Sequence, residues 1–238
     1  MINSTTSYSF FTGEFFVPGA TEIRIEQDHV ARYVFASKYV KSSTVLDIAC
    51  GVGYGSAILA RKEYEATKVF GVDIREDNVE IAKRNYGSDK IVFNCGDILT
   101  YEAGPFDVIV CFETIEHVAA HREVLSNLFK LLRRGGTLLI SSPNRIITSP
   151  SAVSICDKPQ NKYHTQEFTI NELINELEEA GFCVGSQSVY GQRQSIYFKN
   201  RLFQSILRRF WRQEIMSNEV VTPVRRLYPR YFLIVATK

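Results

Sequence analysis

The sequence predicts an α/β fold built on an open, doubly wound sheet of about seven strands, mostly parallel, with helices on both faces. Three observations carry this prediction. Short apolar runs typical of strands alternate with longer amphipathic patterns typical of helices. A helix between consecutive strands permits the crossover connection that a parallel sheet requires. Glycine-rich or acidic segments follow several of the apolar runs, where a sheet of this kind binds its ligands.

The expected elements alternate along most of the chain. Strands are expected at 45–49, 69–73, 91–94, 107–112, 137–141, 183–189 and 231–236. Helices are expected at 21–39, 55–62, 75–86, 120–132 and 170–180, two of them followed by the glycines Gly87 and Gly181. The sequence RRGG at 133–136 predicts a helix end and a turn into the next strand. From 142 to 165 the pattern loosens into a loop.

Charge, cysteine spacing and hydropathy exclude several classes of protein. The 238 residues carry a formal net charge of +2 at pH 7, which does not favour nucleic acid as a partner. The five cysteines match neither a zinc knuckle nor a disulfide framework, which fits a reducing compartment. No apolar run approaches the roughly 20 residues that span a bilayer, and the first residues lack the regions of a signal peptide. We therefore expect a cytoplasmic protein.

A glycine-rich segment, VLDIACGVGYGSAILA at 45–60, leads out of the first expected strand. Gly51 and Gly53 fall just past the strand end, where glycine lets a ligand approach the backbone. Asp73 ends the second expected strand, and Asp97 in CGDI follows the third. Carboxylates at these places can accept hydrogen bonds from ribose hydroxyls. The spacing predicts an adenosine group that lies across three strand ends.

Two residues argue against a dinucleotide as the ligand. The fingerprint G-x-G-x-x-G requires glycine at the position of Ser56. Asp47 lies inside the first strand, and a buried anion near a pyrophosphate is costly, whereas it suits a ligand with an ammonium and a sulfonium. Either Asp47 or Asp73 could instead cap a helix or anchor a loop. Gly55 is expected to pack helix against strand.

Four motifs in order resemble those of class I S-adenosylmethionine-dependent methyltransferases. They are VLDIACGVGYG, VFGVDI, NCGDI and FDVIVCFETIEHV, and LLRRGGTLLISSPN is similar to the segment that follows them. The resemblance covers residues 44 to 144 closely. It implies a Rossmann-like fold with an antiparallel last strand, S-adenosyl-L-methionine as the cofactor, and methyl transfer as the reaction. The cofactor contacts that it implies come from Asp47, Gly51, Gly53, Asp73, Asp97, Ile98 and Glu113.

The segment CFETIEHVAAH at 111–121 follows the fourth expected strand and should face the cofactor. Histidine titrates near neutral pH, so His117 is the first candidate for the base that takes a proton from an acceptor hydroxyl, with Glu116 beside it. The alternative is that Glu116 and His117 only open a helix, while Glu113 hydrogen-bonds the loop.

The spacing Glu113-x-x-Glu116-His117 also resembles an acid-acid-histidine cluster of two methyltransferase groups. These are the polyprenyl-dihydroxybenzoate O-methyltransferases and the small-RNA 3′-terminal 2′-O-methyltransferases, in which such residues hold a divalent ion against vicinal oxygens. The RNA enzymes add a histidine, for which His164 in NKYHTQEFTINEL is the candidate. The resemblance implies a site for Mg²⁺, Mn²⁺ or Zn²⁺ at Glu113, Glu116, His117 and His164. Many family members carry a similar Glu-His pair without a metal, so a metal-free site stays open.

Segments outside the cofactor core bear on the acceptor. TGEFFVPG, SSPNR, YHTQEFT and YGQR resemble a methyltransferase subgroup of bacterial surface-polysaccharide biosynthesis, although Phe15 stands where that subgroup has arginine. This implies O-methylation of a sugar hydroxyl, on a nucleotide sugar, a sugar phosphate or a glycan. Arg145, Arg193, Tyr163 and His164 would supply polar partners, although each arginine could equally be a solvated loop charge.

These segments divide one expected domain, 1–238, into three parts. Residues 1–43 form an N-terminal lid and helix, 44–144 the cofactor-binding core, and 142–238 the acceptor-side loops with the last helices and strands. Residues 198–215 predict a basic amphipathic helix that could contact a membrane surface or a second copy of the chain in a homo-oligomer, or pack as core.

Other acceptors and other classes remain as alternatives. A quinone-type or catechol-type small molecule, or an RNA 2′-hydroxyl, could be the acceptor. An NAD-dependent oxidoreductase is disfavoured by Ser56 and Asp47. A non-catalytic cofactor-binding protein is disfavoured by the intact first motif.

Overall fold

The computed structural model describes residues 23–194, 221–224 and 228–238. The TGEFFVPG segment and the amphipathic pattern at 198–215 lie outside these residues. Within the described part, no helix is both long and apolar enough to cross a membrane.

Helices and strands alternate as the sequence predicts. The α-helices are α1 (Ile23–Ala36), α2 (Tyr54–Leu59), α3 (Glu76–Tyr86), α4 (His121–Leu131), α5 (Arg145–Thr148) and α6 (Ile170–Glu179). Single 3₁₀ turns are η1 (Ser37–Tyr39), η2 (Lys62–Tyr64) and η3 (Ile115–His117). The strands are β1 (Thr44–Ile48), β2 (Lys68–Asp73), β3 (Ile91–Cys95), β4 (Phe106–Phe112), β5 (Leu132–Pro143), β6 (Cys183–Gln192), β7 (Thr222–Pro223) and β8 (Tyr231–Thr237).

The strands form one 8-stranded sheet in the order β3-β2-β1-β4-β5-β8-β6-β7. The pairs from β3 to β5 are parallel, β8 is antiparallel to both β5 and β6, and β7 is antiparallel to β6. The predicted mostly parallel sheet with an antiparallel last strand is therefore confirmed. Because the chain leaves β1 toward β2 and β3 and returns beside β1 as β4, the strand order reverses between β1 and β4. An open sheet of this kind binds its ligands at this switch point.

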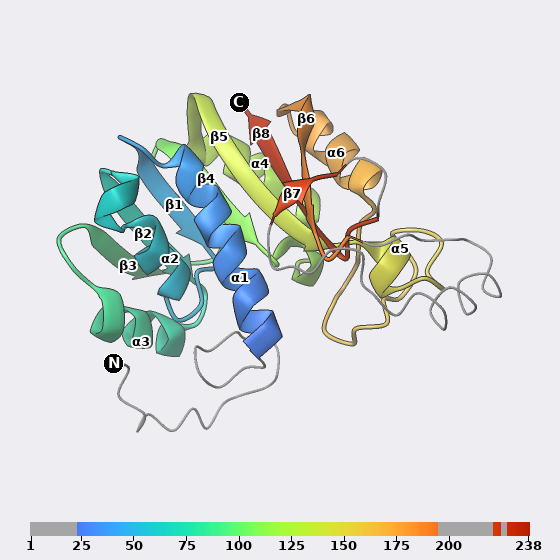
Figure 1. Ribbon diagram of the computed structural model, residues 1–238, viewed down its shortest axis with the longest axis horizontal. Helices are drawn as coiled ribbons and strands as arrows, with labels where there is room; N and C mark the ends of the chain where they lie inside the picture. The colour runs from blue at the N-terminus through green and yellow to red at the C-terminus, as the bar shows by residue number, and fades with distance from the viewer. Residues whose placement is uncertain (1–22, 195–220, 225–227) are drawn as a thin grey trace.

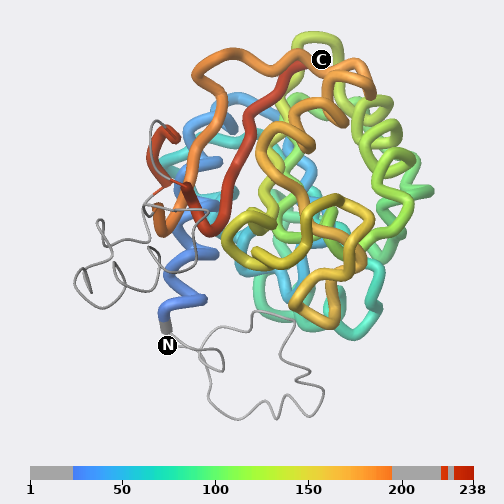
Figure 2. The backbone as a smooth tube through the Cα atoms, turned by 90° about the vertical axis from the view of Figure 1, so that its right-hand side faces the viewer, coloured from blue at the N-terminus to red at the C-terminus, as the bar shows by residue number. Residues whose placement is uncertain are grey.

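Helices cover both faces of the sheet (Figures 1 and 2). On one face, α1, α2 and α3 bury apolar residues against the sheet, among them Tyr33, Leu59 and Val79. On the other face, α4 and α6 contribute Leu125 and Leu173 to a second cluster. With both faces covered, the strands read as nearly continuous apolar runs, which is why the sequence pattern identified them.

One local prediction was wrong, and one strand was not expected. The helix before β5 ends at Leu131, close to the predicted end, but residues 133–136 belong to β5 instead of forming a turn. The β4–β5 register shifts between Phe106 and Val108, and Gly135 N–H donates to the Lys238 carbonyl at 2.8 Å, which extends the strand. The two-residue strand β7 was not expected, because Thr-Pro carries no strand pattern of its own.

Gly55 packs against a helix and not against a strand. A Cβ at Gly55 would lie 2.0 Å from the Tyr33 ring of α1, so this glycine lets α1 approach α2 closely. The contact brings α1 beside the glycine-rich loop, and α1 is thereby available to line a site at the carboxyl ends of the strands (Figure 1).

Candidate active site

The glycine-rich loop between β1 and α2 turns back through left-handed backbone. Gly51 has φ +55°, and Gly53 has φ +85°. Nothing lies within 4 Å of the place where a Cβ of Gly51 would stand, whereas a Cβ at Gly53 would meet Ala82 at 2.7 Å. Gly51 therefore leaves open space beside the backbone, and Gly53 permits close packing of the loop against α3.

Asp73, at the end of β2, is tied to this loop. Its side chain is 6% exposed, and Oδ2 accepts a hydrogen bond from Gly51 N–H at 2.9 Å. Oδ1 accepts from Arg75 N–H at 3.0 Å and from Asn78 Nδ2 at 3.1 Å. These donors fix the orientation of the carboxylate beside Gly51, at the predicted place for a ribose.

Asp47 is buried inside the fold. Its side chain is 1% exposed, and it accepts hydrogen bonds from Ser56 Oγ at 2.6 Å and Tyr33 Oη at 3.0 Å. Burial raises the pKa of Asp47 from 3.8 to about 7, although the bonds from Ser56 and Tyr33 oppose the rise. The residue that breaks the dinucleotide fingerprint, Ser56, is thus a partner of this acid. Asp47 thus joins α1 and α2 to β1, and its contact with a cofactor stays a prediction.

Asp97 and Ile98 follow β3 on the same edge of the sheet. Asp97 Oδ1 accepts from Leu99 N–H at 2.9 Å, which closes a tight turn. Ile98 is 8% exposed, and its carbonyl accepts from Asn127 Nδ2 at 2.8 Å. Both residues lie in the turn that follows β3, and their contact with a cofactor stays a prediction.

Glu113 follows β4 in left-handed backbone, with φ +48°. Its Oε1 accepts a hydrogen bond from Ser141 Oγ on β5 at 2.7 Å. This hydrogen bond joins the end of β4 to β5. Among the described residues, the group of side chains close enough to hold a metal ion does not include Glu113.

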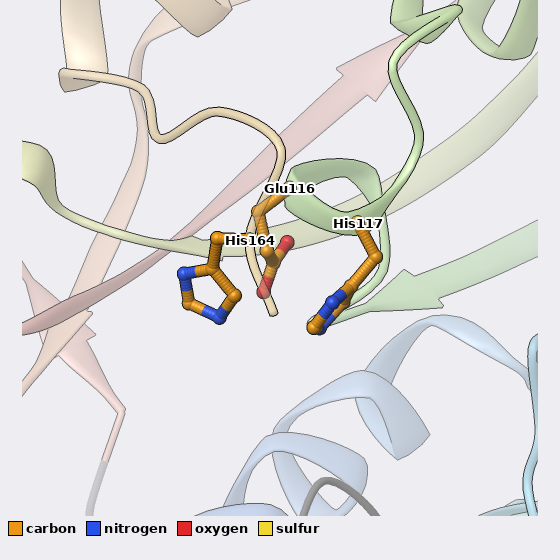
Figure 3. Close-up of side chains that lie close together, drawn as sticks. All are labelled: Glu116, His117 and His164. Carbon is orange, nitrogen blue, oxygen red and sulfur yellow. The ribbon is translucent and has the colours of Figure 1, made fainter. Parts of the chain in front are cut away.

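Three of the four predicted metal ligands do lie together. Glu116, His117 and His164 each offer a ligand atom, and these atoms lie within 4.8 Å of one another (Figure 3). Hydrogen bonds hold the two contributing segments side by side, because Thr165 N–H donates to the Glu116 carbonyl at 2.9 Å and Gln166 Nε2 donates to the Val118 carbonyl at 2.8 Å.

The charge on Glu116 is poorly compensated. The side chain is 1% exposed, and its Oε2 has no hydrogen-bond partner. Burial raises the pKa of Glu116 well above its ordinary range, and the nearby Glu113 carboxylate raises it further. A buried carboxylate of this kind is stabilised by a proton or by a bound cation.

Both imidazoles of the cluster have acceptors at Nδ1. His117 Nδ1 lies 3.1 Å from the Tyr163 carbonyl oxygen, and His164 Nδ1 lies 2.7 Å from Glu167 Oε1. Carbonyl and carboxylate oxygens only accept, so in the neutral rings the proton lies on Nδ1 and the lone pair on Nε2. Nε2 is the atom that can bind a cation or take a proton.

Arg32 on α1 is a buried cation that sequence analysis did not single out. Its side chain is 2% exposed, Nη1 donates to Gln192 Oε1 at 2.6 Å, and Nε has no partner. In the described part of the chain it forms no ion pair with an acid. Its positive charge lowers the pKa of His29 and opposes the rise at Glu116. The only signal in the sequence is its four-residue spacing from Asp28 and Ala36 on one helix face, too common a pattern to single it out.

Arg145 and Arg193, expected near the acceptor, form ion pairs within the fold. Arg145 is 3% exposed and pairs with Glu172 at 2.6 Å, while Nη1 donates to the Glu167 carbonyl at 2.9 Å. Arg193 pairs with Asp28 at 2.6 Å. Each guanidinium therefore makes an ion pair inside the fold, and neither is the solvated loop charge that the sequence left as the alternative.

Comparison with known proteins identifies the family. A family model described as a methyltransferase domain matches residues 40–207. A protein of Mycolicibacterium smegmatis, named "Probable S-adenosylmethionine-dependent methyltransferase", is 34% identical over 185 residues, which are 76% of this chain and 68% of the relative. The chain belongs to the class I S-adenosylmethionine-dependent methyltransferases.

Two further matches relate this methyltransferase to proteins of more specific description. A ubiquinone biosynthesis O-methyltransferase of Coxiella burnetii is 35% identical over 118 residues, about half of each chain (48% and 49%). The crystal structure of magnesium protoporphyrin IX methyltransferase from Synechocystis, with S-adenosylhomocysteine bound, has a TM-score of 0.57 at 18% identity and covers 90% of this chain and 82% of that one. The latter likeness confirms the fold, and the acceptor of this methyltransferase is not established by either.

Asp47 should make the stability of the methyltransferase fall with rising pH. Its pKa is about 7 in the folded state against 3.8 ordinarily, so between these values the native state holds a proton that the unfolded state has lost. Protonation of Asp47 makes its full contribution to the free energy of unfolding below pH 4. This contribution is lost as pH rises toward 7, at up to about 1.4 kcal/mol per pH unit. Urea unfolding from pH 4.5 to 7.5 should show this fall relative to Asp47→Asn, which does not titrate. Parallel curves for the two proteins would contradict the assignment.

Proposed function

We propose that this methyltransferase transfers the methyl group of S-adenosylmethionine to a hydroxyl oxygen of a sugar. The observation that carries the proposal is the cluster of Glu116, His117 and His164, formed by the η3 turn after β4 and the segment before α6. Methyl transfer to an alcohol needs a group that removes the hydroxyl proton or stabilises the alkoxide, and an acid with two imidazoles meets that need.

An oxygen acceptor has support from a relative and from the chain itself. The Coxiella relative is named as an O-methyltransferase. For a sugar, the support is the resemblance of SSPNR, YHTQEFT and YGQR to the polysaccharide-associated subgroup. Tyr163 is 42% exposed, and its carbonyl lies 3.1 Å from His117 Nδ1, so in this proposal its ring borders the acceptor. A quinone-type acceptor is the second candidate, favoured by the same relative.

The cofactor would lie across the carboxyl ends of β1, β2 and β3. In this proposal Asp73 accepts hydrogen bonds from the ribose hydroxyls, Gly51 leaves room for the chain of the cofactor, and Asp97 and Ile98 contact the adenine. Gly53 and Asp47 act indirectly, by shaping the loop. Glu113, held by Ser141, borders the cofactor on the β4 side.

Arg32 would bind the carboxylate of the cofactor's methionine part. The cofactor carries this anion in addition to its ammonium and sulfonium, and a buried anion needs a cation. Arg32 is buried, lacks an acidic partner among the described residues and has Nε unsatisfied. Burial raises the pKa of Tyr54, the first residue of α2, and the positive charge of Arg32 opposes this rise.

The cluster has the chemistry of a divalent cation site. Glu116 Oε2 is a buried oxygen with no hydrogen-bond partner, and the two imidazoles carry their lone pairs on Nε2. One carboxylate and two imidazoles suit Mn²⁺ or Zn²⁺ and are a less typical set for Mg²⁺. A bound cation would lower the pKa of an acceptor hydroxyl and orient a neighbouring oxygen.

The methyltransferase must also position the acceptor. Its side chains must hold the acceptor oxygen about 3 Å from the methyl carbon and in line with the breaking bond to sulfur. In a site without a cation, His117 is the base that takes the hydroxyl proton, and Glu116 lies beside it to stabilise the imidazolium.

We place the reaction in the cytoplasm, since the described cysteines are all free thiols.

The role of Arg32 can be separated from general damage to the site. Arg32→Met should weaken S-adenosylhomocysteine binding by about 10- to 100-fold through loss of a charged hydrogen bond. It should leave 5′-methylthioadenosine, which lacks the carboxylate, unaffected. Asp73→Ala is the matched control and should weaken both ligands, because both carry the ribose. Calorimetric titration in which Arg32→Met affects the two ligands equally would remove the carboxylate assignment.

One screen tests the acceptor and the cation together. Labelled cofactor should methylate a nucleotide sugar, sugar phosphate or glycan, and chelation should abolish this activity until Mn²⁺ or Zn²⁺ is restored. Glu116→Gln and His164→Gln should lose the metal-dependent rate by about 10²-fold or more while S-adenosylhomocysteine still binds. Full activity after exhaustive chelation would exclude the cation and leave His117 as the base. Methylation of a catechol or an RNA end, with no sugar substrate active, would overturn the proposed acceptor.

A further inference from the structure

Glu167 is a buried acid that the mechanism above does not use. It lies between α5 and α6, its side chain is 1% exposed, and both carboxylate oxygens are bonded. Oε1 lies 2.7 Å from His164 Nδ1, and Oε2 accepts from Thr148 Oγ1 of α5 at 2.5 Å. A pair between an acid and a histidine this deeply buried is costly unless its geometry is well satisfied.

The backbone around Glu167 is fixed as firmly as the side chain. Its carbonyl accepts from Arg145 Nη1 at 2.9 Å, and the neighbouring Phe168 carbonyl accepts from Arg145 N–H at 2.9 Å. The carboxylate is therefore held by α5 at one oxygen and can act on His164 only through the other.

The contact determines which nitrogen of His164 carries the proton. Glu167 Oε2 already accepts from Thr148 Oγ1, and Oε1 faces His164 Nδ1 at 2.7 Å. A carboxylate is acceptor-only, so Nδ1 must donate, and Nε2 keeps the lone pair. Figure 3 shows the His164 ring beside Glu116 and His117. Partners that fix a ligand imidazole in this way usually affect metal affinity or activity strongly.

We propose that Glu167 is the positioning residue of this site: it keeps His164 in the Nδ1–H form and presents Nε2 to Glu116 and His117. What Nε2 then does rests on the proposed function. Asn161 Nδ2 lies 2.9 Å from Nε2, so the Asn161 amide occupies this lone pair until a ligand displaces it.

The tautomer can be observed directly by nitrogen NMR of imidazole-labelled protein. The chain has 4 histidines, and the spectrum of His164→Gln assigns the signal. Wild type should show His164 protonated at Nδ1. Glu167→Ala should move the ring toward the Nε2–H form or a mixture. Glu167→Gln should restore the Nδ1–H form, because the amide oxygen still accepts from Nδ1 while its amino group can donate to Thr148 Oγ1, whose hydroxyl lies 2.9 Å from the Asn144 carbonyl.

A matched control separates positioning from loosening of the loop. Glu172 is the other acid on this segment, and it pairs with Arg145 at 2.6 Å without touching His164. Glu172→Ala should leave the His164 tautomer unchanged. An Nε2–H form in the wild type, an unchanged tautomer in folded Glu167→Ala, or an equal change in Glu172→Ala would each overturn the proposal.

Cation binding gives a second measurement. Mn²⁺ titration should show a dissociation constant raised about 10- to 100-fold in Glu167→Ala and little changed in Glu167→Gln. If wild type binds no Mn²⁺, the cation in the proposed function fails, and the tautomer measurement still decides the role of Glu167. If wild type binds Mn²⁺ and Glu167→Ala binds it equally well, the positioning role is overturned.

Discussion

The buried carboxylate of Asp47 is the interaction on which the rest of the site depends. It lies on β1, at the centre of the parallel strands, and accepts hydrogen bonds from α1 through Tyr33 and from α2 through Ser56. A charge placed there has to be neutralised or surrounded by donors, because the cost of burial is high. Those donors fix where α1 and α2 meet, and with them the glycine-rich loop. Gly55 makes the arrangement sterically feasible, since α1 and α2 touch where any larger residue would collide with the Tyr33 ring.

From this anchor the site extends along the carboxyl ends of the strands in two directions. Toward β2, Asp73 accepts a hydrogen bond from Gly51 of the loop, at the place predicted for a ribose. Toward β4 and β5, the η3 turn and the segment before α6 meet through the Glu116 carbonyl, which brings together two histidines 47 residues apart in sequence. The helix that Asp47 holds in place also carries Arg32. One buried acid thus positions both the glycine-rich loop and the helix that carries Arg32.

The sequence predicted what local pattern and topology determine. Strand ends were predictable because buried parallel strands are continuous apolar runs, and residues following several such strands meet at one edge. Asp73, Gly51 and the Glu116–His117 pair were predicted as site residues in this way. Arg32 and Glu167 were not, because their roles depend on burial and on partners distant in sequence, which no local pattern reveals. The same limit explains why Glu113, spaced like a ligand, bonds Ser141 instead, and why Arg145 and Arg193 turn inward. The sugar acceptor was predicted only from the resemblance of sequence segments to a methyltransferase subgroup, because the fold does not determine the acceptor.

A double-mutant cycle on the two donors of Asp47 tests the central claim most directly. Tyr33→Phe and Ser56→Ala each remove one hydrogen bond and leave the packing largely intact, and the free energy of unfolding is measured at pH 8, where the carboxylate is charged. If one shared carboxylate joins α1 and α2, the two substitutions should be coupled by at least about 0.5 kcal/mol, because both donors serve one buried group. Effects that add within about 0.3 kcal/mol would show that the helices are placed independently of Asp47 and would contradict this account.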